Sequence, residues 1–255
     1  IETLSAAWQA SLRERFGLRA SSAPPGRELI SGDTPGQGRL HVSPSLSPDG
    51  RWLVYLSERN LFSLDLFLVE AASGRVVRRL TTSDTDPHIE SLQFVTSAGG
   101  WSADSARFAF TTIRRGTPTL TIVNVAQGSS TEEIELADVD DAWHATWSPK
   151  GDAIAFAGHA GGYSDLYVLD LTTRAVRRLT NDPYADLHPA WSPNGDAIAF
   201  VTERFSTDLD KLQFGPMRPA LLTMASGEVT ALPAMEGARH INPQWTANGR
   251  SIVMI

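Results

Sequence analysis

The stretch HATWSPKGDAIAFAG, residues 144–158, recurs 44 residues later as HPAWSPNGDAIAFVT, residues 188–202. A third copy, PSLSPDGRWLVYLS, occupies residues 44–57, and a weaker one, WSADSARFAFTT, occupies residues 101–112. A fifth copy, NPQWTANGRSIVMI, occupies residues 242–255. Self-similarity at a fixed period is the signature of similar structural units placed side by side, so this repeat decides the fold.

The copies share one anchor position, which holds leucine in the first copy and tryptophan in the others. Successive anchors are 55, 46, 44 and 54 residues apart. The anchors are Leu46, Trp101, Trp147, Trp191 and Trp245. These spacings lie near the roughly 40–50 residues of a β-propeller blade. Residues 41–255 therefore predict an all-β propeller with four complete repeats and part of a fifth.

Four short strands fit each repeat. The first ends at the anchor, and a Ser-Pro-Xaa-Gly turn follows, in which proline presets φ and glycine tolerates a positive φ. In the third repeat the remaining strands are expected at 153–156, 165–170 and 176–179. The fourth strands carry Arg78-Arg79 and Arg177-Arg178, for which we expect exposed, weak cross-strand ion pairs. The anchor tryptophans are expected to pack between blades, and an exposed aromatic face is the alternative.

Two segments lengthen the repeat. The fourth repeat carries about ten extra residues, around 205–217, before its third strand. The connection from the first repeat to the second, residues 81–100, is also long. Insertions in propellers fall in loops on one face, where binding residues are often found.

Residues 1–20 lie outside the repeat. Apolar residues recur there every four positions, which predicts an amphipathic helix, and we interpret it as the end of a preceding domain. Docking of this helix on the propeller is the alternative. Residues 21–40 are rich in serine, proline and glycine and are interpreted as a linker. Because the chain starts without methionine and residues 251–255 form an apolar strand with no turn after it, we expect a segment of a longer protein.

The composition excludes several classes of function. The chain has 255 residues, a net charge of −7 and no cysteine. An acidic chain lacks the basic surface that nucleic acids and anionic membranes attract, and no apolar run reaches the roughly 18 residues of a membrane span. Without cysteine, disulfides, thiolate metal sites and a cysteine nucleophile are excluded. The zinc motif His-Glu-Xaa-Xaa-His and the hydrolase motif Gly-Xaa-Ser-Xaa-Gly are also missing, so we predict no catalytic residue in this segment.

Polar residues recur just before the anchors. His144 and His188 each lie three residues before a tryptophan, and Asn242 holds that place in the fifth repeat. If the anchor strand is innermost, its start opens toward the central channel, and these side chains would bind a polar ligand, a partner or a divalent metal at one mouth. The candidate residues are His41, Asp86, His88, Asp141, His144, Asp186, His188, His240 and Asn242. The alternative is that they hydrogen-bond turn backbone and adjacent blades, and recur because the structure repeats.

The full unit reads Trp-Ser-Pro-Xaa-Gly, Ile-Ala-Phe, Asp-Leu-Tyr-Val-Leu-Asp and Arg-Arg-Leu-Thr, most completely over residues 147–180. It resembles the TolB-like, WD-like β-propeller repeat of bacteria, over roughly residues 41–255. The resemblance implies a six-bladed ring and a non-catalytic module that binds a protein or peptide partner. It also implies a periplasmic or extracellular location within a larger protein. Similar repeats accompany serine peptidase and metallopeptidase domains, so an accessory domain of a linked peptidase or other hydrolase is the alternative.

Overall fold

The computed structural model divides the chain into two units, Ile1–Ile30 and Ser31–Ile255. The residues that it describes are 6–8, 10–12, 26–31, 38, 40–60, 63–81, 89–92, 99–125, 131–235 and 240–254. In the first unit, residues 6–8 and 10–12 are helical, in agreement with the expected short N-terminal helix. No helix within the described residues is long and apolar enough to cross a membrane.

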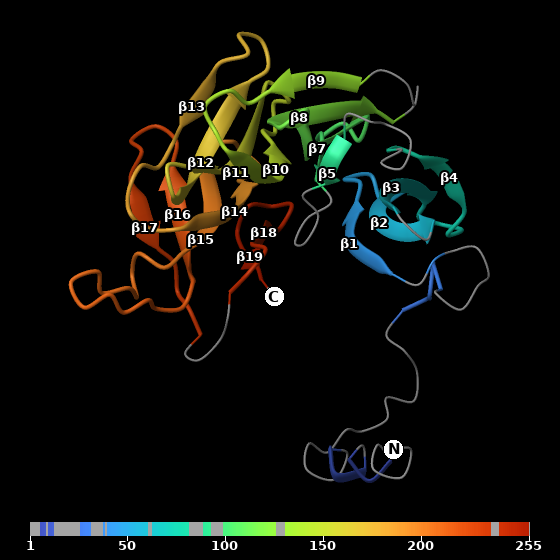
Figure 1. Cartoon of the computed structure of the whole chain (residues 1–255), viewed down its shortest axis with the longest axis horizontal. Helices are drawn as coiled ribbons and strands as arrows, with labels where there is room; N and C mark the ends of the chain where they lie inside the picture. The colour runs from blue at the N-terminus through green and yellow to red at the C-terminus, as the bar shows by residue number, and fades with distance from the viewer. Residues whose placement is uncertain are drawn as a thin grey trace. The chain divides into compact units, whose positions relative to one another are not determined.

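In the second unit, the described strands form antiparallel sheets in which neighbours in sequence are neighbours in space (Figure 1). The first sheet contains β1 (His41–Leu46), β2 (Trp52–Asn60), β3 (Ser63–Glu70) and β4 (Val76–Arg79). The third contains β10 (Asp141–Trp147), β11 (Ala153–Ala160), β12 (Tyr163–Asp170) and β13 (Val176–Arg178). The fourth contains β14 (Asp186–Trp191), β15 (Ala197–Thr202), β16 (Arg218–Thr223) and β17 (Val229–Ala231). The fifth contains β18 (Gln244–Trp245) and β19 (Ile252–Val253).

The second sheet differs from the others at its inner edge. It contains β5 (Ile89–Leu92), β6 (Gly100–Trp101), β7 (Arg107–Arg114), β8 (Thr117–Asn124) and β9 (Thr131–Glu135). Both β5 and β6 pair with β7, so they share the place that a single strand holds elsewhere. The segment 81–100, which the sequence suggests is a plain connection, therefore includes part of the inner strand.

The sheets pack against one another through buried hydrophobic residues, as blades of a propeller do. A cluster that includes Phe108 joins the first and second sheets, and one that includes Phe156 joins the second and third. A cluster that includes Phe200 joins the third and fourth. The first strand of each sheet contacts the first strand of the next, from β1 and β6 through β10 and β14 to β18. The predicted all-β propeller with a partial fifth blade is confirmed.

Indole hydrogen bonds tie the second, third and fifth sheets to the preceding one. Nε1 of Trp101 donates to the carbonyl of Ser45, and Nε1 of Trp147 donates to the carbonyl of Gly100, both at 3.0 Å. Nε1 of Trp245 makes the same bond, 3.0 Å to the carbonyl of Ala190 in the fourth sheet. Trp101 and Trp147 are buried, which agrees with the expectation that the anchors pack between blades.

The ion pairs of the outer strands differ from those expected. Arg79 pairs with the buried Asp65 at the start of β3, with 2.5 Å between Nη2 and Oδ2. Arg178 pairs in the same way with Asp165, which has no exposed surface. The expectation of exposed, weak pairs is wrong at these two arginines, because the third strand begins with a carboxylate that the sheet buries. Arg177 is exposed, as expected.

Candidate functional site at the starts of the inner strands

The third residue before the anchor lies at a β-bulge in the first, third and fourth sheets. The strand register shifts there, between Val42 and Ser45 in the first sheet and between Leu187 and Ala190 in the fourth. In each case the residue is left-handed, with φ of 52° at Ser43, 57° at His144 and 55° at His188. Asn242, at the same repeat position just before β18, is also left-handed, with φ of 49°. Left-handed φ is uncommon outside glycine, and histidine and asparagine are among the residues that adopt it most. A bulge redirects its side chain and often lies beside a functional site.

These left-handed residues bring three side chains from successive sheets into contact. The rings of His144 and His188 stack with centroids 4.0 Å apart and an interplanar angle of 24°. Nδ1 of His188 lies 2.5 Å from Oδ1 of Asn242. We call this set of His144, His188 and Asn242 the bulge row. It crosses the third, fourth and fifth sheets at their innermost strands.

The bulge row is uncharged at neutral pH. Burial, together with the neighbouring His188, lowers the pKa of His144 to about 3. Burial also lowers the pKa of His188, and the hydrogen bond to Asn242 opposes this shift. Because Oδ1 of Asn242 only accepts, Nδ1 of His188 must carry the proton, and Nε2 keeps its lone pair. Nε2 of His188 is therefore a hydrogen-bond acceptor in a fixed tautomer. The other ring nitrogen, Nδ1, is held by a hydrogen bond, as is typical of a histidine that ligates a metal.

Two of the three predicted aspartates, Asp141 and Asp186, lie at the starts of inner strands but have local partners. Asp141 accepts a hydrogen bond from the backbone N–H of Ala142 at 2.9 Å, and burial raises its pKa. Asp186 is fully buried and accepts a hydrogen bond of 2.6 Å from Nη2 of Arg204. Burial raises the pKa of Asp186 to about 6, although its hydrogen bonds and Arg204 oppose the shift.

The remaining candidates are placed away from the bulge row or are not described. Nδ1 of His41 lies 3.0 Å from Oγ of Ser57, and its ring meets Tyr55 edge-on, within the first sheet. Nε2 of His240 accepts a hydrogen bond of 3.2 Å from the backbone N–H of Met235. Asp86 and His88 lie outside the described residues. Of the nine candidates, the structure thus brings His144, His188 and Asn242 together, while His41, Asp141, Asp186 and His240 make local hydrogen bonds.

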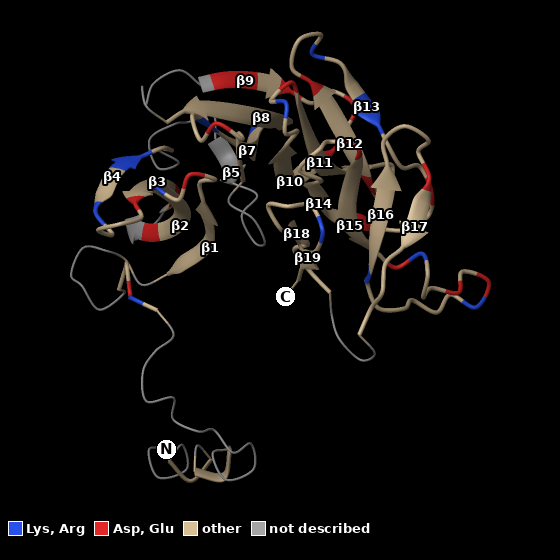
Figure 2. Ribbon diagram, turned by 180° about the vertical axis from the view of Figure 1, so that it is seen from behind, with Lys and Arg blue, Asp and Glu red and all other residues tan. Residues whose placement is uncertain are grey.

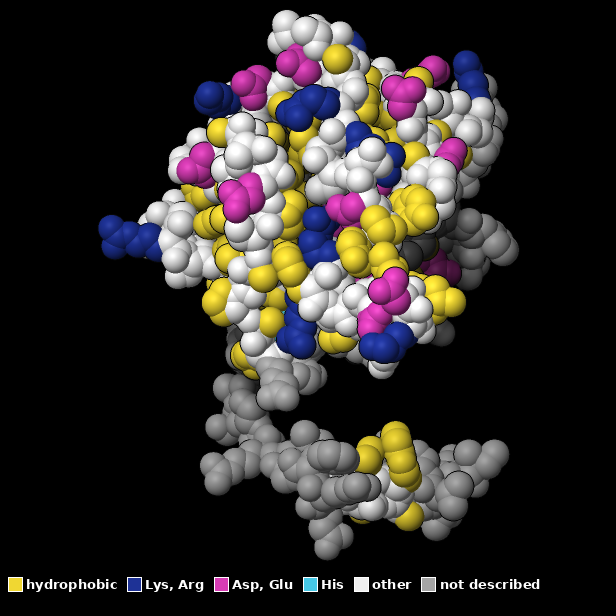
Figure 3. Space-filling model, turned by 90° about the vertical axis from the view of Figure 1, so that its left-hand side faces the viewer, with side chains coloured by type: hydrophobic (Ala, Val, Ile, Leu, Met, Phe, Trp, Pro, Cys, Tyr) yellow, Lys and Arg dark blue, Asp and Glu magenta, His cyan; other side chains and the backbone are white. Residues whose placement is uncertain are grey.

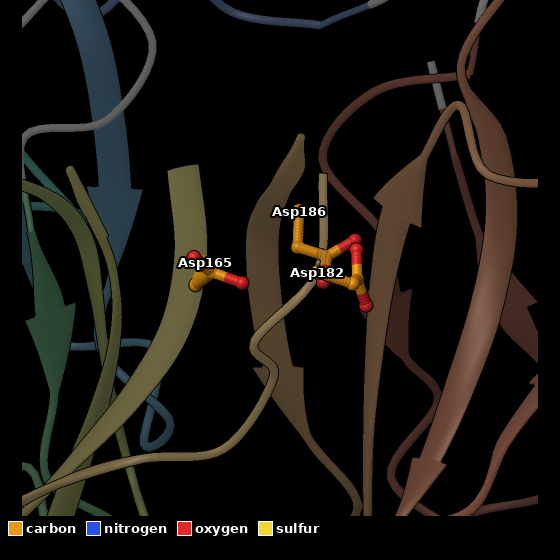
Figure 4. Close-up of side chains that lie close together, drawn as sticks. All are labelled: Asp165, Asp182 and Asp186. Carbon is orange, nitrogen blue, oxygen red and sulfur yellow. The ribbon is translucent and has the colours of Figure 1, made fainter. Parts of the chain in front are cut away.

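A cluster of carboxylates that the sequence reasoning missed lies between the third and fourth sheets. Oxygens of Asp165, Asp182 and Asp186 fall within 4.8 Å of one another (Figure 4). Arg178 pairs with Asp165, and Arg204 pairs with both Asp182 and Asp186. Since each of the three carboxylates already pairs with one of these two guanidinium groups, we interpret the cluster as an ion-pair network that joins two blades. Asp165, near the start of the third strand of its repeat, was the sequence signal that could have pointed to this cluster.

Comparison with known proteins agrees with this architecture. The family described as TolB beta propeller domain matches residues 89–255. The chain belongs to the TolB β-propeller family. Several hundred solved chains share this fold with it, whereas no curated protein matches its sequence.

Two TolB structures are among the similar folds. TolB from Acinetobacter baumannii has a TM-score of 0.64 and 20% identity over 84% of this chain and 48% of its own. A putative TolB from Agrobacterium tumefaciens has a TM-score of 0.63 and 20% identity over 83% of this chain and 70% of its own. An oligogalacturonate lyase in complex with manganese has a TM-score of 0.50 and 14% identity, over 85% and 74%. The chain thus spans about half the length of the Acinetobacter TolB.

Proposed function

We propose that this TolB-family propeller is a non-catalytic module that binds a protein or peptide partner where its inner strands begin. The bulge row is the observation that carries the proposal. His144, His188 and Asn242 are all left-handed, the first two within β-bulges, and this conformation costs free energy and persists only where the surrounding structure enforces it. Three such residues in contact across three blades form a polar surface suited to hydrogen-bond donors such as peptide N–H groups.

The chemistry of the row favours binding over catalysis. His188 donates to an amide oxygen, whereas a histidine that acts as general base is commonly oriented by a carboxylate. Burial holds the pKa of His144 at about 3, far below the near-neutral value that suits a general base. We therefore assign both rings to ligand recognition.

The family supports a periplasmic or extracellular location, and we propose that the propeller forms part of a larger protein there. The accessory domain of a linked peptidase or other hydrolase is the second form of this proposal. It agrees with the bulge row equally well, because a peptide delivered to a linked enzyme would meet the same surface. Sequencing of the coding region on both sides for a hydrolase motif separates the two forms.

A divalent metal is the second candidate ligand, because Nε2 of His188 has its lone pair in a fixed tautomer. The manganese in the lyase of similar fold is consistent with this candidate. Metal analysis of the purified chain after incubation with Mn²⁺ or Zn²⁺ tests it. One ion per chain that His188→Asn removes would favour the metal over the peptide.

The peptide proposal is tested with a library of 12-residue peptides displayed on phage and selected on the full chain. His188→Asn removes the imidazole but retains a residue that tolerates left-handed φ, as Asn242 does in the fifth sheet. We expect this variant to bind the selected peptides about tenfold more weakly, as loss of a central contact does. Lys150→Ala, at an exposed turn at the other end of the third sheet, is the matched control. Equal loss in both variants, or none in either, would contradict the proposal.

A further inference from the structure

The loop between β15 and β16, residues 203–217, is a defined hairpin. Backbone hydrogen bonds of 2.9 Å join Asp208 and Gln213 in both directions. Oγ of Ser206 donates to the carbonyl of Pro216 at 2.6 Å, and the N–H of Gly215 donates to Oγ1 of Thr207 at 3.0 Å. The equivalent hairpins, between β7 and β8 and between β11 and β12, have two-residue turns, Arg115-Gly116 and Gly161-Gly162. This insertion is therefore a structured addition to the fourth blade, at the place where the sequence predicted extra residues.

The tip of the loop presents hydrophobic side chains to solvent. Leu212 is 77% exposed, Phe214 is 74% exposed and Phe205 is 45% exposed. We call this set the loop tip. Figure 3 looks onto the side from which the loop projects, and hydrophobic side chains there lie next to acidic and basic ones.

Leu212 is unfavourable at its position in two independent ways. Its φ is 52°, a left-handed conformation in which glycine or asparagine would be less strained. Its side chain also gains almost nothing from burial within this chain. Neither the left-handed backbone nor the exposure to solvent favours leucine at this position. A contact with another molecule explains this residue better. An observed backbone outlier of this kind is a recognised pointer to function.

The loop tip lies at the same end of its blade as the bulge row. Thr202, which ends β15, pairs with Asp186 at the start of β14, two residues before His188. Other exposed hydrophobic residues occur in loops at this end, namely Tyr163 in the β11–β12 hairpin and Met235 and Ile241 between β17 and β18. A partner that reaches the bulge row can therefore also meet an apolar surface.

The charges of the loop indicate the chemistry of this partner. Nζ of Lys211 lies 2.6 Å from Oδ2 of Asp208, so that the cation is neutralised within the loop. Asp210 is exposed, and the structure gives it no ion pair among the described residues. Figure 2 shows acidic and basic residues close together on the loop that projects beside β16 and β17. An uncompensated carboxylate beside leucine and phenylalanine complements a segment that carries apolar and basic side chains.

We propose that the loop tip is a docking surface for a peptide segment of a protein partner that combines apolar side chains with lysine or arginine. This inference rests on the proposed function and names the chemistry of its partner. Anionic lipid is the disfavoured occupant, because Asp210 and the net charge of −7 would repel it.

The test uses the full chain and the same phage-displayed 12-residue peptides. We expect the selected peptides to be enriched in aromatic or aliphatic residues together with lysine or arginine. Leu212→Asn combined with Phe214→Ser should weaken their binding about tenfold while the melting temperature stays equal or rises, because asparagine suits the left-handed φ. Leu46→Asn, at a leucine that is 58% exposed at the opposite end of the first blade, is the control and should bind normally.

The possible results separate this inference from the proposal on which it rests. Peptides that lose affinity in His188→Asn but not in the loop double variant would overturn the inference and leave the proposed function standing. If no peptide is enriched, both are overturned. Sedimentation of the chain with phosphatidylglycerol vesicles, abolished by the loop double variant, would also overturn the inference in favour of a lipid surface. Enrichment of acidic peptides would contradict the lysine or arginine assigned to the partner and would overturn the inference as well.

Discussion

His188 donates a hydrogen bond from Nδ1 to Oδ1 of Asn242 across 2.5 Å, and the two residues hold the same repeat position in successive blades. Both are left-handed, and the ring of His188 stacks on that of His144 in the preceding blade. One position of the repeat therefore produces contacts between successive blades.

The buried ring of His144 should make stability depend on pH. Its pKa of about 3 in the folded chain lies below the ordinary value of 6.5, so below pH 6.5 the unfolded chain binds the proton that the folded chain refuses. The contribution of His144 to the free energy of unfolding is thus complete above pH 6.5 and falls by at most about 1.4 kcal/mol per pH unit toward pH 3.

Urea unfolding of the wild type and of His144→Asn at pH 7, 6 and 5 measures this dependence. The unfolding free energy of the wild type minus that of His144→Asn should decrease as the pH falls. Asp186, whose pKa is raised to about 6, is present in both proteins, so its titration cancels in the difference. A difference that stays constant from pH 7 to pH 5 would contradict a buried, neutral His144.

The indole bond of Trp147 should contribute measurably to stability. Trp147→Phe removes the donor to Gly100, and we expect a loss of about 1 kcal/mol more than in Trp191→Phe. Nε1 of Trp191 is buried and has no hydrogen-bond partner among the described residues, so the same substitution there removes no hydrogen bond. Thermal and urea unfolding of both variants make the comparison, and equal losses would show that indole hydrogen bonds do not tie these blades together.

Arg178 should be far more important than its neighbour Arg177. Arg178→Gln leaves the fully buried Asp165 without its cation, for which we expect a loss of about 2 to 3 kcal/mol. Arg177→Gln changes an exposed side chain, so the expected change stays within about 0.5 kcal/mol. If both variants unfold at the same urea concentration, the ion pair does not stabilise the blade.

The sequence predicted the blades well because anchor, turn and strand recur together, and each signal is local. It failed over residues 81–100, because β5 carries no anchor and is recognised only by its pairing with β7. In the site, the common spacing of His144, His188 and Asn242 was visible, but their left-handed φ was not. Asp186 lies two residues before His188, where a regular strand would place both side chains on one face. The bulge changes this relationship, and Asp186 turns instead to Arg204.

The most direct test of the central claim, that the bulge row contacts the partner, is the ¹⁵N spectrum of the histidine rings. Spectra are recorded for the full chain alone and saturated with a selected peptide, and the His188 signals are assigned by their loss in His188→Asn. We predict that the Nε2 signal of His188 shifts on binding, and that it shifts equally in the control variant Lys150→Ala. A His188 signal that is unchanged at saturation would contradict the account.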